Sequence, residues 1–146
     1  SPPWGTVQKY MYKMIGKFSH IKNVKKRVEE ISKKMSLTYL LNRKMKSLTP
    51  GEIRWVVLAT MIGADSKVLF IDEIELHLGK KDQKTLLSIL HRKINYDGVT
   101  VILSTQNKDF LSRIASVTIT LENGRIISVR STGKKKNKYS DKRRKR

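Results

Sequence analysis

The sequence predicts an α/β fold with an additional helical part at its N-terminus. Two apolar runs, at residues 68–71 and 99–103, enclose a segment at 82–95 whose apolar residues recur at helical spacing. This strand–helix–strand alternation is typical of a βαβ unit with a parallel sheet. The segments 6–18 and 23–35 show helical spacing without such strands. The chain has 146 residues, enough for one domain with a modest core.

Two helices are expected in the N-terminal part. The first covers residues 6–18, where apolar side chains recur at helical spacing. The second covers residues 23–35, because Asn23 is a suitable N-cap and the apolar residues after it fall on one stripe, with charged residues on the rest of the surface. A short apolar link at residues 37–41 follows.

A third helix should begin at Thr49. The run Thr-Pro-Gly-Glu contains a capping box, in which Thr49 is the N-cap and Glu52 is the N3 residue. Pro50 falls at the first helical position, where proline is favoured. A broad apolar face follows, and Gly63 marks the end of the helix.

The remaining elements form the βαβ unit and a C-terminal hairpin. The apolar run 68–71 predicts a buried strand of a parallel sheet, and Asp97-Gly98 turns the chain into the second strand. A short helix at 107–115 precedes two alternating strands. Asn123-Gly124 between those strands is a strong signal for a tight hairpin. The two hairpin strands are expected at 117–121 and 125–130.

The net charge of +20 is concentrated at the two ends of the chain. Residues 1–46 carry twelve Lys or Arg against two Glu, and residues 133–146 carry nine against one Asp. Residues 47–132 carry eleven against nine acids and are electrostatically ordinary. The basic C-terminal run can bind RNA, DNA or anionic lipid through counterion release, or it can merely keep the chain in solution.

Composition excludes several classes of protein. The sequence contains no Cys, so a disulfide framework, a thiolate metal site and a Cys nucleophile are ruled out. No apolar run reaches 18 residues, which excludes a membrane-spanning helix within these residues.

Two acidic residues stand directly after the first predicted strand. Ligands of open α/β sheets bind beyond the carboxyl ends of the strands, so Asp72 and Glu73 are well placed for chemistry. Asp72 could hold Mg²⁺ through its water shell, and Glu73 could polarise an attacking water. The alternative is an acidic pair that only caps the following loop.

Read in order, these motifs resemble the later part of an ATP-binding cassette (ABC) ATPase domain over roughly residues 2–130. Leu-Thr-Pro-Gly-Glu at 48–52 stands where the family has its signature, and Val-Leu-Phe-Ile-Asp-Glu at 68–73 is similar to Walker B with the catalytic Glu. The further matches are the stretch that follows the Q-loop at 3–7, the strand before the switch at 101–106 and the closing hairpin at 121–126.

The resemblance implies a partial P-loop NTPase-like sheet with flanking helices, preceded by a helical subdomain. It implies ATP and Mg as cofactors, with Asp72 ordering Mg²⁺ through water, Glu73 as general base and Gln106 at the switch position. Thr49, Gly51 and Glu52 would contact the nucleotide held by an opposing subunit. The expected divisions are a helical subdomain at 1–46, an α/β core at 47–132 and a flexible basic tail at 133–146.

The departures from the family pattern concern the phosphates. No segment satisfies G-x-x-x-x-G-K-[ST], so the phosphate-cradling loop is absent from this sequence. Pro50 replaces a Gly of the signature and removes a backbone N–H. Gln106 replaces the switch His and cannot act as a cation. We therefore expect the chain alone not to hydrolyse ATP.

The partners that the resemblance implies are a second ABC ATPase subunit or the missing N-terminal half of the cassette. Residues 9–46 would dock on a membrane partner or on another subunit. In the first case the protein is cytoplasmic, is peripheral at the membrane and powers a transporter. In a second hypothesis, residues 9–46 and 133–146 bind RNA or DNA and the cassette serves as a scaffold. In a third, the chain is a non-catalytic interaction module.

Overall fold

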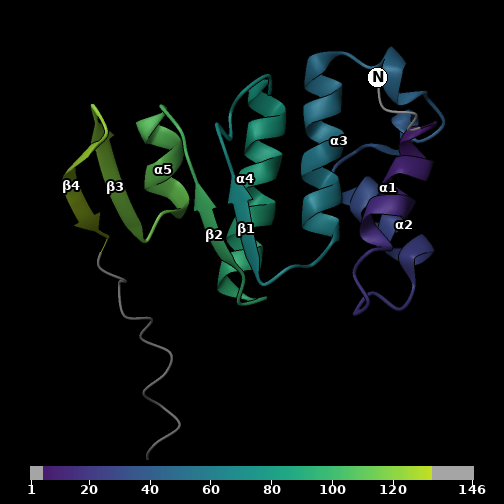
Figure 1. Cartoon of the computed structure of the whole chain (residues 1–146), viewed down its shortest axis with the longest axis horizontal. Coiled ribbons are helices and arrows are strands. Elements are labelled where there is room, and N and C mark those ends of the chain that lie inside the picture. The colour runs from purple at the N-terminus through teal and green to yellow at the C-terminus, as the bar shows by residue number, and fades with distance from the viewer. Residues whose placement is uncertain (1–4, 133–146) are drawn as a thin grey trace, which may run out of the picture. The chain divides into compact units, whose positions relative to one another are not determined.

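The computed structural model describes residues 5–132 of the chain (Figure 1). The predicted basic tail at 133–146 lies outside the described residues. The chain divides between Gln106 and Asn107 into two compact units. The first unit holds the predicted helical part and the βαβ unit, and the second holds the hairpin. The predicted boundaries at residues 46 and 132 stay predictions.

Three helices pack together in the first unit: α1 (Val7–Ile15), α2 (Val24–Lys34) and α3 (Pro50–Gly63). Asn23 accepts a hydrogen bond from the Lys26 amide and caps α2, as predicted. Gly63 permits the close approach of α3 to α1, because a Cβ at Gly63 would lie 2.9 Å from Ile15 Cδ1. Two 3-10 turns, η1 (Thr38–Leu40) and η2 (Met45–Ser47), occupy the link between α2 and α3.

Helix α3 begins as the sequence predicts. The Thr49 hydroxyl accepts a hydrogen bond from the Glu52 amide at 3.3 Å, and Glu52 Oε2 accepts one from the Thr49 amide at 2.8 Å. The capping box is thus complete. The indole of Trp55 is buried and donates to the Met35 carbonyl at 2.9 Å, which joins α3 to the end of α2.

The βαβ unit consists of β1 (Val68–Ile71), α4 (Lys80–Asn95) and β2 (Thr100–Leu103). The two strands pair in parallel, with Val68 opposite Thr100 and Ile71 opposite Leu103. The predicted parallel pairing is therefore confirmed. Figure 1 shows α4 lying against this strand pair. Its contribution to the core includes the fully buried Leu86 and Leu90.

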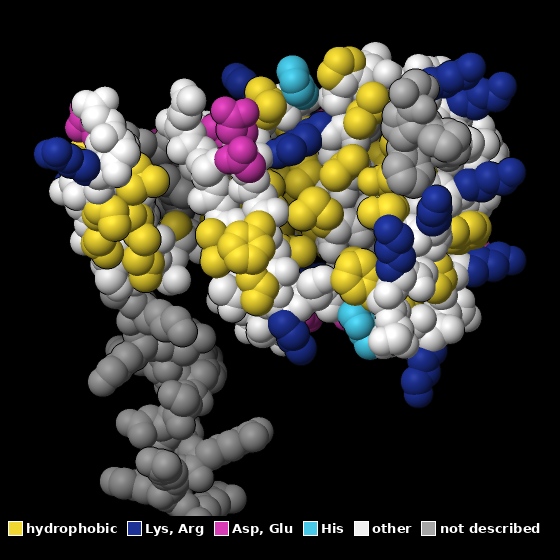
Figure 2. Space-filling view, viewed as in Figure 1, with side chains coloured by type: hydrophobic (Ala, Val, Ile, Leu, Met, Phe, Trp, Pro, Cys, Tyr) yellow, Lys and Arg dark blue, Asp and Glu magenta, His cyan; other side chains and the backbone are white. Residues whose placement is uncertain are grey.

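The prediction that β1 is a buried strand is wrong for one of its faces. Leu69 and Ile71 are buried, but Phe70 is 66% exposed and Val68 is 44% exposed. Side chains alternate between the two faces of a strand, and within residues 5–132 only one face of this two-stranded sheet is covered. Ile102 of β2 adds to the exposed face, where apolar side chains gather over the strand pair (Figure 2).

The second unit contains α5 (Lys108–Ile114) followed by an antiparallel hairpin. Strand β3 (Val117–Glu122) pairs with β4 (Arg125–Ser131). Asn123 and Gly124 have φ values of 47° and 73°, as a type I′ turn requires. The predicted hairpin is confirmed, with an irregularity in register between Thr120 and Leu121.

Candidate functional site

The candidate site lies where β1 and β2 end. Ile71 and Leu103 are paired, so the residues that follow them, Asp72 and Ser104, emerge side by side. The Ser104 amide donates to the Ile71 carbonyl at 3.0 Å, and its hydroxyl donates to Asp72 Oδ1. The Glu73 amide in turn donates to the Ser104 hydroxyl oxygen at 2.8 Å. We call residues 72–75, which follow β1, the acidic turn. Ser104 thus holds the start of this turn in place.

Glu73 occupies an unusual backbone conformation. Its φ of 44° lies in the left-handed region, which costs a non-glycine residue about 1–3 kcal/mol. The next residue is anchored, since the Ile74 amide donates to the Ser104 carbonyl at 3.1 Å and the Ile74 side chain is fully buried. The turn is therefore fixed on both sides of Glu73 while the Glu73 side chain stays exposed.

Neither acid is neutralised by a neighbouring base among the described residues. The ion pairs found there engage other carboxylates, those of Glu30, Glu52, Asp65 and Asp97. The Asp72 carboxylate accepts from the neutral Ser104 hydroxyl and forms no ion pair among the described residues. The site consequently presents net negative charge at the end of the parallel strands, where Figure 2 shows acidic side chains gathered.

Helix α3 packs against the backbone of the acidic turn. Arg54 Nη2 donates to the carbonyl oxygens of Asp72 and Glu73, the latter at 3.1 Å. A Cβ at Gly51 would lie 2.8 Å from the His77 carbonyl oxygen, so only glycine permits this approach without displacement. The structure thereby brings the predicted signature residues at the start of α3 next to the turn that follows β1.

The polar groups of the signature are already engaged within the chain. Thr49 and Glu52 form the capping box, and Glu52 Oε1 also accepts from Arg43 Nη1 at 2.7 Å. The hydrogen bond from the Thr49 amide is the main cause that lowers the pKa of the Glu52 carboxyl. These contacts give Thr49 and Glu52 a structural role that does not depend on a nucleotide.

Gln106 also reaches the acidic turn. The backbone amide of Gln106 donates to Glu75 Oε1 at 3.0 Å, and the Gln106 side chain is exposed. The three predicted residues Asp72, Glu73 and Gln106 are therefore held on one edge of the sheet by hydrogen bonds between the segments that follow β1 and β2.

The donor set fits a magnesium ion only in part. Residues 5–132 contain no group of three or more His, Cys, Asp or Glu side chains arranged to hold a metal. Asp72 and the Ser104 hydroxyl provide one carboxylate and one neutral oxygen. Mg²⁺ in phosphate-transfer sites is held by one or two carboxylates together with phosphates and water, so this pair suits an ion that arrives with a nucleotide.

Ser104 and Arg54 are site residues that the sequence analysis missed. Ser104 follows a strand predicted to run parallel to the first, and two parallel strands end at the same sheet edge, so its position next to Asp72 could have been inferred. Arg54 gave no such signal, because its carbonyl partners depend on how α3 packs against the turn.

The chain is similar to known proteins in sequence and in fold. No protein-family model matches the chain. The cell division ATP-binding protein FtsE of Streptococcus pneumoniae is 28% identical over 124 residues, which are 85% of this chain and 53% of FtsE. The energy-coupling factor transporter ATP-binding protein EcfA of Carboxydothermus hydrogenoformans is 28% identical over 107 residues, 73% of this chain and 39% of EcfA.

Solved structures share the fold. A dimeric bacterial ABC transporter cassette has a TM-score of 0.78 at 20% identity, over 89% of this chain and 58% of that one. A Clostridium perfringens protein that is part of the ABC transporter complex cbiONQ has a TM-score of 0.67 at 21% identity, over 87% of this chain and 51% of that one. The chain spans about half the length of FtsE.

Proposed function

We propose that this chain, which is homologous to ABC ATPase nucleotide-binding domains and has the fold of part of their cassette, contributes the catalytic acids of an ATP·Mg-hydrolysing site that powers a membrane transporter. The match to part of each relative is consistent with a C-terminal portion of the cassette. The observation that carries the proposal is the fixed acidic turn after β1, with Ser104 bonded to Asp72 and Glu73 left exposed.

Each residue of the site has a chemical task in this proposal. Asp72 holds water molecules of a Mg²⁺ ion, and Ser104 orients the Asp72 carboxylate. Glu73 accepts a proton from the water that attacks the terminal phosphate. When bound, Mg²⁺ neutralises negative charge on the phosphates. Gln106 donates a hydrogen bond toward the same region through its side-chain amide.

The signature residues serve a second nucleotide in the proposal. Thr49, Gly51 and Glu52 lie at the start of α3 and would face a nucleotide held by an opposing cassette. The dimeric arrangement of one structural neighbour supports this part of the proposal. The capping contacts of Thr49 and Glu52 mean that these residues act by positioning the helix N-terminus rather than through free side chains.

The phosphate-cradling loop has to come from a segment outside this sequence. No G-x-x-x-x-G-K-[ST] run is present, so the partner is the N-terminal half of a cassette or a second subunit. The exposed apolar face of β1 and β2, formed by Val68, Phe70 and Ile102, supports this proposal, because a sheet face of this kind is normally covered in parallel α/β folds.

The membrane domain is the proposed recipient of the work done by ATP hydrolysis. Among the described residues, no helix is both long and apolar enough to cross a bilayer. We place the chain at the cytoplasmic side of a membrane domain, with residues 9–46 as the docking region. Binding of RNA or DNA through residues 9–46 and 133–146 stays a prediction, and the relatives named above give it no support.

Fusion to a P-loop tests the proposal directly. We would join the chain to the P-loop-bearing first half of a homologous cassette and measure ATP binding and hydrolysis. Glu73→Gln should leave ATP binding intact and lower the hydrolysis rate about 100-fold or more, because the general base is lost. Glu122→Gln in the hairpin is the matched control and should hydrolyse ATP normally. Unchanged hydrolysis in Glu73→Gln, or a fusion that binds no ATP, contradicts the proposal.

A further inference from the structure

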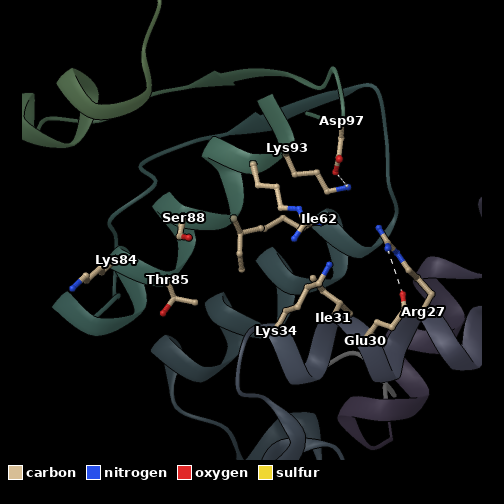
Figure 3. Close-up of a pocket in the computed structure, with 12 residues that line it drawn as sticks. Arg27, Glu30, Ile31, Lys34, Ile62, Lys84, Thr85, Ser88, Lys93 and Asp97 are labelled. Carbon is tan, nitrogen blue, oxygen red and sulfur yellow. Dashed lines mark ion pairs between the residues drawn. The ribbon is translucent and has the colours of Figure 1, made fainter. Parts of the chain in front are cut away.

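A cavity of about 480 Å³ lies between α2, the end of α3 and α4 (Figure 3). Its volume falls within the range of about 300–1,000 Å³ that is usual for small-molecule sites. Three isoleucines, Ile31, Ile62 and Ile89, give it an apolar part. Its lining residues include none of the acids at the end of β1, so it is separate from the site proposed for ATP hydrolysis.

One wall of the cavity is fixed by a network of ion pairs. Lys93 is 9% exposed and bonds both Asp65 Oδ1 and Asp97 Oδ2, the latter at 3.1 Å. Arg27 of α2 lies 3.3 Å from the same Asp65 oxygen and 3.8 Å from Glu30 Oε2. Ion pairs therefore connect α2, Asp65 beyond the end of α3, and α4 along this wall.

Further cations at the cavity are left without a carboxylate partner among the described residues. Lys34 and Arg92 line this cavity and also an adjoining polar cavity of about 350 Å³. Lys67 lines the adjoining cavity as well. Figure 3 shows Lys34 reaching from α2 toward α4, and Lys84 standing at the outer end of α4. The ion-pair network holds two cations and three carboxylates, one negative charge in excess, whereas Lys34, Arg92 and Lys84 add three positive charges that form no ion pair among the described residues. The lining as a whole is therefore positive.

Hydroxyl groups stand beside these cations. Thr85 and Ser88 of α4 line the cavity on the side opposite Lys34 (Figure 3). The Thr85 hydroxyl already donates to the Lys81 carbonyl at 3.1 Å, whereas the Ser88 hydroxyl can donate a hydrogen bond to a phosphate oxygen. Lys and Arg bind phosphate through charge-assisted hydrogen bonds. An apolar part, a hydroxyl donor and cations outside the ion-pair network are together the lining that a phosphate ester with an apolar group requires.

We propose that this cavity binds a small organic phosphate, with its phosphate between Lys34 and Arg92 and its apolar portion against Ile31, Ile62 and Ile89. The cavity volume of about 480 Å³ suits a small molecule rather than a nucleic acid, since a polymer would need a basic track that extends across the surface. The ligand class follows from this cavity alone and does not depend on the proposed ATP site.

Binding of 1-naphthyl phosphate, which joins an aromatic ring to a phosphate, provides the test. Titration of the 146-residue chain should show saturable binding, and Lys34→Gln/Arg92→Gln should weaken it about tenfold or more. The matched control is Lys26→Gln/Lys81→Gln, which removes the same charge from the exposed surface of the same two helices. The control should change the affinity by less than about twofold. Circular dichroism verifies that both variants fold.

The outcomes distinguish binding of the phosphate ester in this cavity from general attraction of an anion to a cationic protein. Weaker binding of inorganic phosphate than of 1-naphthyl phosphate supports the proposal, because the apolar part then contributes. Equal loss in both double variants overturns it, since binding would then follow net charge alone. Absence of binding by the wild-type chain also overturns it. A third result would also overturn the proposal. If a single-stranded RNA oligonucleotide competes with 1-naphthyl phosphate and binds Lys34→Gln/Arg92→Gln more weakly than the wild type, the surface serves a polymer.

Discussion

Asp65 shows how one carboxylate can join three helices. It follows α3, accepts a hydrogen bond from Lys93 of α4 and lies 3.3 Å from Arg27 of α2. The hydrogen bond from Lys93 is the largest cause that lowers the pKa of Asp65, with Arg27 and His20 adding further stabilisation of the charge. His20 itself contacts the Ala64 carbonyl at 3.0 Å, so charged and polar groups surround the end of α3.

This arrangement predicts an acid-sensitive contribution to stability. Because the pKa of Asp65 is lower in the folded chain than its unfolded value of about 4, the unfolded state binds more protons in this range. The contribution is complete above pH 4 and is lost as the pH falls through the lowered pKa. Asp65→Asn should reduce the free energy of unfolding by ~1 kcal/mol at pH 7 and less below pH 4.

Urea unfolding at a series of pH values measures this difference. Glu29→Gln, which removes an exposed carboxylate of α2, is the control and should leave the unfolding free energy nearly unchanged. A difference between wild type and Asp65→Asn that stays constant down to pH 2 would mean that the carboxylate contributes through something other than its charge.

At the scale of elements, the contact between α3 and the turn after β1 depends on Gly51. An alanine Cβ there would lie 2.8 Å from the His77 carbonyl oxygen, which is backbone and cannot move aside alone. Gly51→Ala should therefore destabilise the chain by about 1–3 kcal/mol, although alanine is the better helix former. Gly79→Ala is the matched control, because its Cβ would have no neighbour closer than 4.0 Å. Chemical denaturation of both variants provides the measurement, and equal stability would contradict the packing described here.

Elements with a local signal were predictable from the sequence. The capping box at Thr49, the Asn123-Gly124 turn and the βαβ alternation each depend on residues close together in the chain, and the structure contains all three. The exposure of Phe70 was not predictable, because an apolar run of four residues does not reveal whether one or both faces of its strand are covered.

The same distinction applies to the candidate site. Asp72 and Glu73 could be placed at a strand end from the sequence, since they directly follow an apolar run. Their contacts with Ser104 and Arg54 join segments that lie 18 to 32 residues apart, and these depend on strand register and helix packing. The ion-pair network around Asp65 likewise requires three helices to be in place before its partners can be recognised.

At the scale of the whole molecule, the first unit presents a hydrogen-bonded acidic turn and an exposed apolar sheet face. The acidic turn is fixed by hydrogen bonds within the unit, whereas the apolar face of β1 and β2 is exposed within residues 5–132. We propose that this acidic turn faces a bound ATP·Mg once the phosphate loop is supplied, and that a partner then covers the apolar face.

Paramagnetic broadening by ATP·Mn²⁺ tests that claim most directly. The isotope-labelled fusion carrying a P-loop would be titrated with ATP·Mn²⁺, and backbone amide signals compared with those in ATP·Mg²⁺. If the account is correct, the amides of Asp72, Glu73 and Gln106 broaden first, while those of Lys84 and Arg92 persist. Bound ATP·Mn²⁺ that leaves the amides of Asp72 and Glu73 sharp, or that broadens the α4 amides instead, would contradict it.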